Sequence, residues 1–317
     1  MPRAERRIAL RVLQAGALTI VIVAAPYKTF DLDRFFVPKE LVLSVTALVV
    51  TLLCLVRVKR ISMSRADQLL ALWLALGVVS AVFATNWWLA GRAVAVSLGG
   101  AACFWCARTL SRAGHARALV AALALAGVVG ATTALLQAYG VTTDFVSLNR
   151  APGGTFGNRN FMAHLCVITL PALLLSGLRA PTRASCGRWC AGMALVAGAL
   201  ILSRSRAAWL ALVAGIIVLI IVGLIALRRG DGSLALSRLL LLAVAAGAGA
   251  AAALVIPNTL DWKSNSPYAD TANSIVNYKG GSGHGRLIQH RRSGACVGDA
   301  AASHTGGAAH PPVHHAP

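Results

Sequence analysis

The sequence predicts an all-α protein: a polytopic integral membrane bundle of about nine transmembrane helices with its N-terminus in the cytoplasm. Of its 317 residues, 57% are hydrophobic and only 13% are charged, and the mean hydropathy of +0.70 lies above that of soluble domains. Long apolar stretches recur along the chain, and most basic residues lie in the short connections between them. These observations together indicate a chain whose main solvent is lipid.

Each predicted helix is an apolar stretch close to the ~17–25 residues that cross a ~30 Å hydrocarbon layer. In chain order the stretches are 8–26, 38–56, 68–85, 91–107, 118–138, 160–178, 189–203, 207–227 and 239–256. The seventh is short and the eighth follows closely. The polar residues 203–206 between them therefore predict a tight turn at the membrane edge or a break within the layer.

The orientation follows from the basic residues, because loops rich in Lys and Arg stay in the cytoplasm. One set of alternate connections is predicted to be cytoplasmic and contains Arg3, Arg6, Arg7, Arg11, Arg57, Lys59, Arg60, Arg65, Arg108, Arg112, Arg117, Arg179, Arg183, Arg188, Arg228, Arg229 and Arg238. The other set is roughly half as large and contains Lys28, Arg34, Lys39, Arg92, Arg150, Arg159, Arg204 and Arg206. These residues are predicted to face outward.

The chain changes character twice after the last apolar stretch. Residues 1–256 are expected to form the transmembrane bundle, and residues 257–289 are polar, as at the beginning of an external loop. From residue 290 to residue 317 the composition shifts to Arg, Gly, Ala, His and Pro without apolar periodicity. We interpret this last segment as a low-complexity tail translated out of frame, so that its histidines are not expected to bind metal.

Composition excludes several other classes of protein. The net charge of +20 comes from short basic clusters without interleaved aromatic residues, so nucleic-acid binding is not expected. Cys103 and Cys106 have CxxC spacing but lie in a predicted membrane helix without a second pair, so neither a zinc site nor a disulfide framework is predicted. Asp31 and Asp33 have the DxD spacing of some metal-dependent glycosyltransferases, but this pattern is too common to predict a metal.

Two outward segments contain the candidate binding residues. The segment from Arg150 to Phe161 concentrates glycines, amides and arginines just before a helix, and its Asn158 and Asn160 could bind a sugar or cap the helix. A simple turn followed by a helix cap explains this segment equally well. Arg204 and Arg206 lie between two apolar stretches, where a charged residue usually faces a polar cavity, although contact with lipid head groups is the alternative.

The order of these segments resembles the O-antigen ligase and polymerase superfamily of bacterial envelope enzymes. Over about residues 15–289, four motifs show the resemblance: Phe36-Val37-Pro38-Lys39, Gly154-Thr155-Phe156-Gly157-Asn158 with Asn160-Phe161, Ser205-Arg206-Ala207-Ala208-Trp209-Leu210, and Gly283-His284-Gly285-Arg286-Leu287. Arg159 stands where the family commonly has proline. The family continues through a longer periplasmic loop, which carries its proposed general base, and through further helices. Here the resemblance stops near Gln289, as expected of a truncated or frameshifted chain whose missing catalytic parts can leave it inactive.

The resemblance implies a glycosyltransferase of the bacterial inner membrane. Such enzymes transfer a glycan from undecaprenyl diphosphate to lipid A-core or another acceptor on the periplasmic face, without a cofactor or metal. The leaving diphosphate gains negative charge, so Arg206, Arg286 and Arg150 are the candidates to hold it, with Asn158, Asn160 and Arg204 as secondary contacts. His284 is not at the position of the family's histidine, and the catalytic residues therefore remain unassigned.

Two other functions stay open at this point. A transporter or flippase of lipid-linked glycan would also need outward arginines and about nine helices, although the sequence lacks the inverted repeat typical of many transporters. A non-functional gene remnant would account for the tail and for the missing family segments. Neither the donor glycan, the acceptor nor the oligomeric state follows from the sequence, and the family motifs do not separate ligase, polymerase and protein O-glycosyltransferase.

Overall fold

The computed structural model describes residues 3–26, 33–55, 63–147, 151–228, 236–262 and 266–276 of the chain. Within these ranges the regular secondary structure is helical throughout and no strand occurs. The chain separates into two compact units, residues 1–261 and residues 262–317. The first unit contains helices α1 to α9 and the second contains α10.

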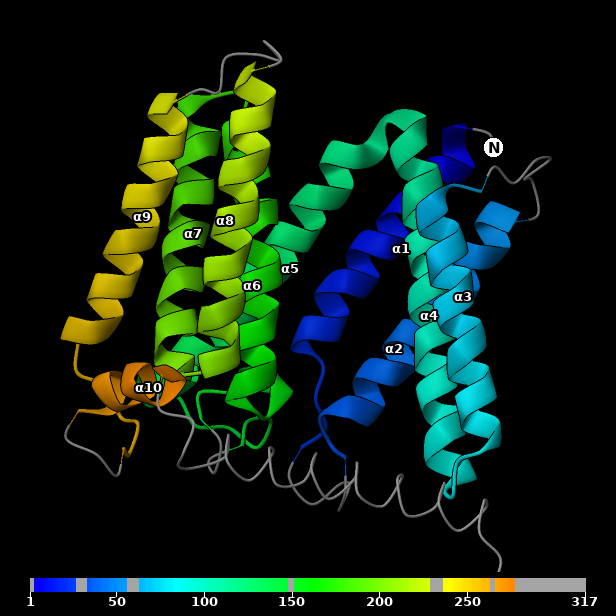
Figure 1. The fold of residues 1–317 in the computed structure, drawn as a ribbon, viewed down its shortest axis with the longest axis horizontal. Coiled ribbons are helices and arrows are strands. Elements are labelled where there is room, and N and C mark those ends of the chain that lie inside the picture. The colour runs from blue at the N-terminus through cyan, green and yellow to red at the C-terminus, as the bar shows by residue number, and fades with distance from the viewer. Residues whose placement is uncertain are drawn as a thin grey trace, which may run out of the picture. The chain divides into compact units, whose positions relative to one another are not determined.

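Every predicted apolar stretch coincides largely with one helix of the first unit (Figure 1). These helices are α1 (Arg3–Ile22), α2 (Phe36–Leu55), α3 (Arg65–Val82), α4 (Trp87–Leu110), α5 (Ala116–Ala138), α6 (Arg159–Leu178), α7 (Arg183–Ser203), α8 (Arg206–Arg228) and α9 (Leu236–Val255). Between α4 and α5 lies a short π-helical turn, Ser111–His115, in which Gly114 has a φ of 92°. Glycine adopts this left-handed conformation without a Cβ penalty, and the chain reverses there (Figure 1).

Six helical segments among the described residues are long and apolar enough to cross a membrane. They are Phe36–Cys54, Arg65–Val82, Trp87–Ala138, Arg159–Leu178, Arg183–Ser203 and Leu236–Val255. The 52-residue segment Trp87–Ala138 includes both α4 and α5 and therefore doubles back at Gly114. A chain with this many apolar helices is a multi-pass membrane protein.

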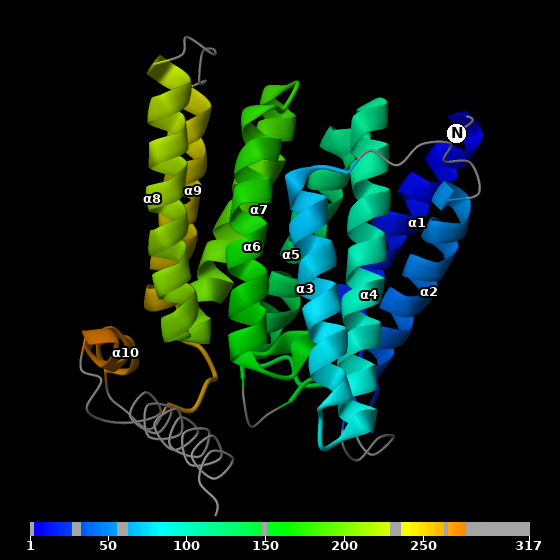
Figure 2. The same ribbon diagram turned by 45° about the vertical axis from the view of Figure 1, so that its right-hand side comes forward.

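The helices run alternately up and down, so the connections gather at two ends of the bundle (Figures 1 and 2). One end, here called the loop end, contains residues 151–158 and the α7–α8 turn at residues 203–206. The other, called the opposite end, contains the α4–α5 reversal and the α6–α7 connection. Those members of the two basic sets that fall within the described residues divide between these ends as the alternation in the sequence predicts.

The larger core cluster joins α5, α6, α7 and α9 through small residues that let the helix backbones approach closely. A Cβ atom at Gly127 of α5 would lie 1.8 Å from Thr169 Oγ1 of α6. Similarly, a Cβ atom at Gly249 of α9 would lie 2.1 Å from the carbonyl oxygen of Ala194 in α7. The absence of these side chains therefore fixes how close the helices lie.

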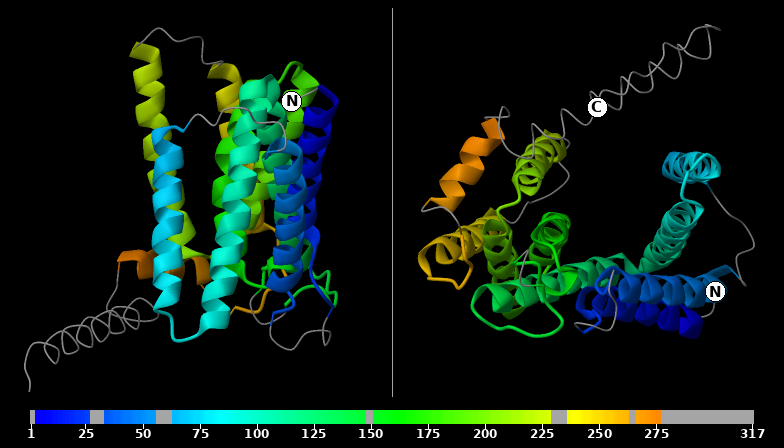
Figure 3. Two further views of the ribbon diagram at one scale, coloured as in Figure 1. Left: turned by 90° about the vertical axis from the view of Figure 1, so that its right-hand side faces the viewer. Right: turned by 90° about the horizontal axis from the view of Figure 1, so that it is seen from below.

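The smaller core cluster joins α1, α2 and α4 through buried residues that include Val50 and Leu110. Helix α5 belongs to both halves of the unit, since it packs on α1 as well as on α6 and α7 (Figure 3). Many apolar side chains on α3 and α8, such as Trp73 and Ile217, remain exposed on the protein surface. In a membrane these side chains face lipid, which is why their exposure is compatible with a stable fold.

The second unit contains one described helix, α10 (Pro267–Val276), within the segment predicted to be polar loop. Its ten residues are too few to cross a membrane. Residues 257–261, which also belong to the predicted loop, lie with the bundle because Thr259 donates its backbone N–H and its hydroxyl to the carbonyl of Ala138. The tail predicted for residues 290–317 lies outside the described residues.

Candidate functional site at the loop end

The segment 151–158 is held by the side chain of Gln137, in the last turn of α5. The Gln137 Oε1 atom accepts hydrogen bonds from the backbone N–H groups of Gly153, at 2.9 Å, and of Gly154, at 2.8 Å. Its Nε2 atom donates to the carbonyl of Ser147 at 2.7 Å. Gln137 is buried, so these bonds satisfy polar groups that water does not reach. One amide side chain thus holds both Ser147 and the Gly153–Gly154 backbone to the end of α5.

Two glycines in the segment have left-handed backbone conformations and leave no room for a side chain. Gly154 has a φ of 52°, and a Cβ atom there would lie 2.3 Å from Thr133 Oγ1. Gly157 has a φ of 64°, and its Cβ atom would lie 2.3 Å from the ring of Phe35. Glycine is the residue type that tolerates both constraints together. The Gly-Thr-Phe-Gly sequence therefore encodes a specific tight turn against α5 and the start of α2.

Two polar contacts connect this turn to α1. The Thr155 hydroxyl donates to the carbonyl of Val21, in the last turn of α1. The buried Lys39 ammonium of α2 donates to the carbonyl of Val23 and lies 4.6 Å from the centre of the Phe156 ring. A cation placed over an aromatic face is stabilised by the ring quadrupole. Through Lys39 and Thr155 the turn, α1 and α2 form one polar assembly.

Helix α6 begins directly after this turn. The side chain of Asn158 caps the helix by accepting from the backbone N–H of Asn160 at 2.9 Å. Asn160 itself is exposed, and Arg159 is half-buried at the first helical position. Phe161 packs edge-on against Phe36 of α2, with ring centres 5.0 Å apart. The capping role expected as the structural alternative for Asn158 is therefore present, and the exposed Asn160 amide remains at the surface.

The α7–α8 connection is a tight turn, one of the two alternatives that the sequence leaves open. Arg204 ends α7 in a left-handed conformation with a φ of 50°, and Arg206 is the first residue of α8. The buried Ser203 hydroxyl donates to the carbonyl of Leu200 at 2.6 Å and accepts from the N–H of Ser205 at 3.4 Å. Both arginine side chains are half-buried. The serines thus satisfy the backbone of the turn and place the two guanidinium groups at the loop end.

Two further basic residues of the set predicted to face outward bind protein groups. Arg92 of α4 forms an ion pair with Asp33 and another with Glu40, the latter at 2.7 Å from Nε to Oε2. Arg34 donates to the carbonyls of Asp144, at 3.0 Å, and Val146, at 3.3 Å. Of the DxD pair, Asp33 is therefore engaged by Arg92, and Asp31 lies outside the described residues. This pairing favours a structural role for Asp33.

The structure places four of the six predicted site residues, Arg204, Arg206, Asn158 and Asn160, at the same end of the bundle (Figures 1 and 2). The other two, Arg150 and Arg286, lie outside the described residues.

Sequence reasoning did not assign roles to Gln137 or Thr155, and it did not predict that Lys39 is buried. A signal was present for Gln137, because it is a polar residue near the end of the otherwise apolar stretch 118–138. No comparable signal marks Thr155, because its partner Val21 lies 134 residues earlier in the chain.

Comparisons of the chain with protein-family models, with curated proteins and with solved structures found no match.

Proposed function

We propose that this chain has the architecture of an O-antigen ligase-like glycosyltransferase of the bacterial inner membrane. In this proposal it crosses the membrane about nine times, with its N-terminus in the cytoplasm and its loop end in the periplasm. It binds a glycan linked to undecaprenyl diphosphate and transfers that glycan to lipid A-core or another glycan or lipid acceptor.

The observation that carries the proposal is the arrangement of helix N-termini at the loop end. Both α6 and α8 start there, and each begins with an arginine, Arg159 or Arg206, without an acidic residue in its first turn. A helix N-terminus already carries a partial positive charge, so a cation costs about 0.3–1 kcal/mol there and an anion is favoured. Two helix N-termini beside a rigid glycine turn create a region of positive electrostatic potential. A site that binds a diphosphate requires such a region.

The chemistry fits this arrangement. A hydroxyl of the acceptor attacks the anomeric carbon of the donor glycan, the bond to the diphosphate breaks, and undecaprenyl diphosphate leaves with the bonding electron pair, while the hydroxyl proton passes to water. Arg206 stabilises the charge that develops on the leaving diphosphate, with Arg286 and Arg150 as further ligands. Asn158, Asn160 and Arg204 contribute contacts around it. A cofactor is not needed for this transfer, because the diphosphate is itself the leaving group.

The direct test is transfer in proteoliposomes that contain the purified chain, a labelled glycan on undecaprenyl diphosphate and lipid A-core. We expect a labelled glycolipid, and a rate about 10²–10³-fold lower for Arg206→Ala, as for the loss of one oxyanion-stabilising donor. Arg188→Ala is the matched control, because Arg188 is an exposed arginine in α7 near the opposite end. It should transfer at the rate of the unmodified chain.

Each remaining outcome would contradict the proposal in a distinct way. Movement of the labelled donor between leaflets without a new glycosidic bond would identify a transporter. Neither movement nor transfer would be the result expected of a gene remnant. Normal transfer by Arg206→Ala would show that Arg206 does not bind the diphosphate. The N-termini of α6 and α8 would then lose their proposed role.

A further inference from the structure

A groove runs between α3 and α4 on the surface of the first unit. Its volume is about 190 Å³, and its walls are made mostly of small residues, among them Gly77 and Ala81 of α3 and Ala90 and Ala93 of α4. The polar side chains in its lining are Ser80 and Ser97, and the Ser97 hydroxyl donates to the carbonyl of Ala93 at 2.8 Å. The groove therefore offers an apolar surface.

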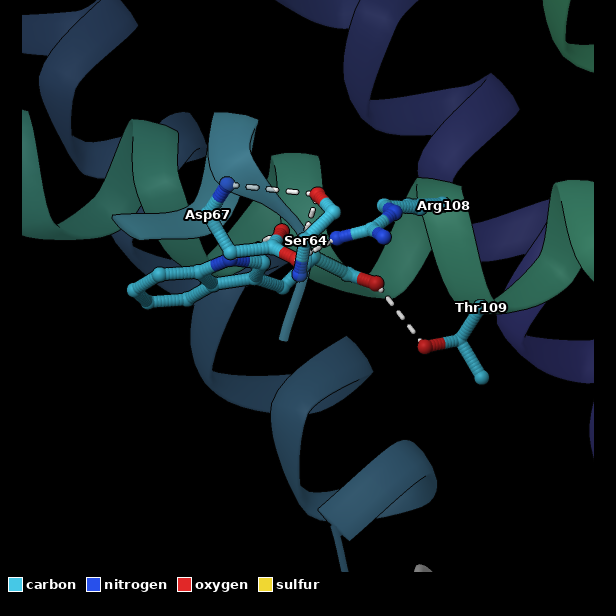
Figure 4. A network of polar contacts seen from close by, with 5 residues as sticks. Ser64, Asp67, Arg108 and Thr109 are labelled. Carbon is cyan, nitrogen blue, oxygen red and sulfur yellow. Dashed lines mark hydrogen bonds and ion pairs between the residues drawn. The ribbon is translucent and has the colours of Figure 1, made fainter. Parts of the chain in front are cut away.

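A polar network fixes the two helices beyond one end of the groove (Figure 4). The buried Asp67 carboxylate of α3 accepts from the Ser64 N–H at 2.6 Å and from the Ser64 hydroxyl at 2.9 Å. It also pairs with Arg108 and accepts from the Trp105 indole at 3.1 Å, both in α4. Long side chains thus hold α3 to α4 here.

The turn between α3 and α4 closes the other end of the groove. Phe83 in this turn and Trp87 and Trp88 at the start of α4 have exposed fractions of 82%, 72% and 79%. Exposed aromatic residues next to an apolar helix typically lie at the membrane–water interface. At a rise of ~1.5 Å per residue, Ser80 and Trp73 of α3 then lie about 4 and 15 Å inward from Phe83. The groove is therefore at the depth of lipid hydrocarbon chains.

We propose that this groove binds one acyl chain of a membrane phospholipid, whose head group lies beside the aromatic turn. Only 6% of the residues in the α3 span are buried in the protein, so in a membrane lipid covers most of this helix. The groove exceeds the ~150 Å³ of a cavity that admits benzene, so it accommodates several methylene groups. It is far too small for a helix of ~10–12 Å diameter, which argues against a second copy of the chain as the occupant.

The test is native mass spectrometry of the full chain taken from nanodiscs of phosphatidylethanolamine and phosphatidylglycerol. Gly77→Leu fills the groove, and a Cβ atom at Gly77 meets nothing within 4 Å, so the backbone need not move. Gly100→Leu is the matched control on α4, since its Cβ atom also meets nothing and it does not line the groove. We expect one retained phospholipid on the unmodified chain and on Gly100→Leu, and at least tenfold less on Gly77→Leu.

Several results would overturn this inference, which is independent of the proposed transferase activity. Equal phospholipid retention by Gly77→Leu would place the lipid elsewhere. A retained polyprenyl lipid in place of a phospholipid would assign the groove to another ligand, and a change in oligomeric state would assign it to a helix of a second copy. If Gly77→Leu does not fold, Ala93→Leu fills the groove from the α4 wall and replaces it in the comparison.

Discussion

Replacing Gln137 by methionine would keep the length of the side chain but remove its three hydrogen bonds to the loop that ends in the Gly-Thr-Phe-Gly turn. In the structure, Gln137 accepts from the N–H groups of Gly153 and Gly154 and donates to the carbonyl of Ser147. These groups are shielded from water by the surrounding helices, so methionine would leave them without partners. We therefore expect the segment 151–158 to detach locally from α5.

The size of the effect follows from the two orphaned N–H groups. A buried donor without a partner costs about 1–3 kcal/mol, so the two together destabilise the closed segment by at least about 2 kcal/mol. Because each 1.4 kcal/mol is a factor of ten in an equilibrium constant, local opening becomes at least about 30-fold more frequent. Hydrogen–deuterium exchange of a peptide that covers residues 151–158 measures this change directly.

Gln14→Met is the matched control, because Gln14 makes one long hydrogen bond, at 3.3 Å, to the carbonyl of Ala118. It should leave exchange in segment 151–158 unchanged. If Gln137→Met exchanges no faster than this control, then Gln137 does not hold the loop, and the rigid turn assumed for the proposed site has another origin.

Two further predictions concern packing and charge in the bundle. Gly249→Leu should lower the thermal stability in detergent, because its side chain would meet the α7 backbone, and overpacking of this kind costs about 1–3 kcal/mol. Gly247→Leu, whose Cβ atom meets nothing within 4 Å, should melt like the unmodified chain, and equal melting of both variants would refute the close α7–α9 contact. Asp67→Asn should lower the free energy of unfolding by about 3 kcal/mol, because it breaks the ion pair with Arg108. This value is near the lower limit for a buried ion pair, since the Arg108 side chain is 21% exposed. In thermal unfolding, the double variant Asp67→Asn with Arg108→Gln should regain part of the lost stability. An unchanged melting temperature for Asp67→Asn would contradict the stabilising role of the polar network around Asp67.

Much of the helical framework could be predicted because lipid imposes a simple requirement on the chain. The apolar stretch 189–203 and the stretch 207–227 correspond to α7 and α8, and the turn between them lies at Arg204 as predicted. Helix α10 was not predicted, because ten largely polar residues carry no comparable signal. The number of membrane crossings and the side of the N-terminus stay predictions.

The arrangement of the helices could not be predicted in the same way. Helices α7 and α9 are not consecutive, yet they pack closely through Gly198 and Gly249, and small residues occur throughout this chain. The candidate site shows the same limit: Arg204, Arg206, Asn158 and Asn160 could be proposed from their motifs. The side chains that hold the loop depend on contacts distant in sequence, which periodicity does not reveal.

The position of α1 has a consequence for biosynthesis. The Val21 carbonyl in α1 receives its hydrogen bond from Thr155, which follows 134 residues later in the chain. At ~5–20 residues per second, the ribosome adds those residues in roughly 7 to 27 s. During that interval α1 lacks α5 and the glycine turn beside it, so the Val21 carbonyl must accept its hydrogen bond from another donor. Mutations in the glycine turn should therefore affect how long newly made chains remain exposed to quality-control proteases.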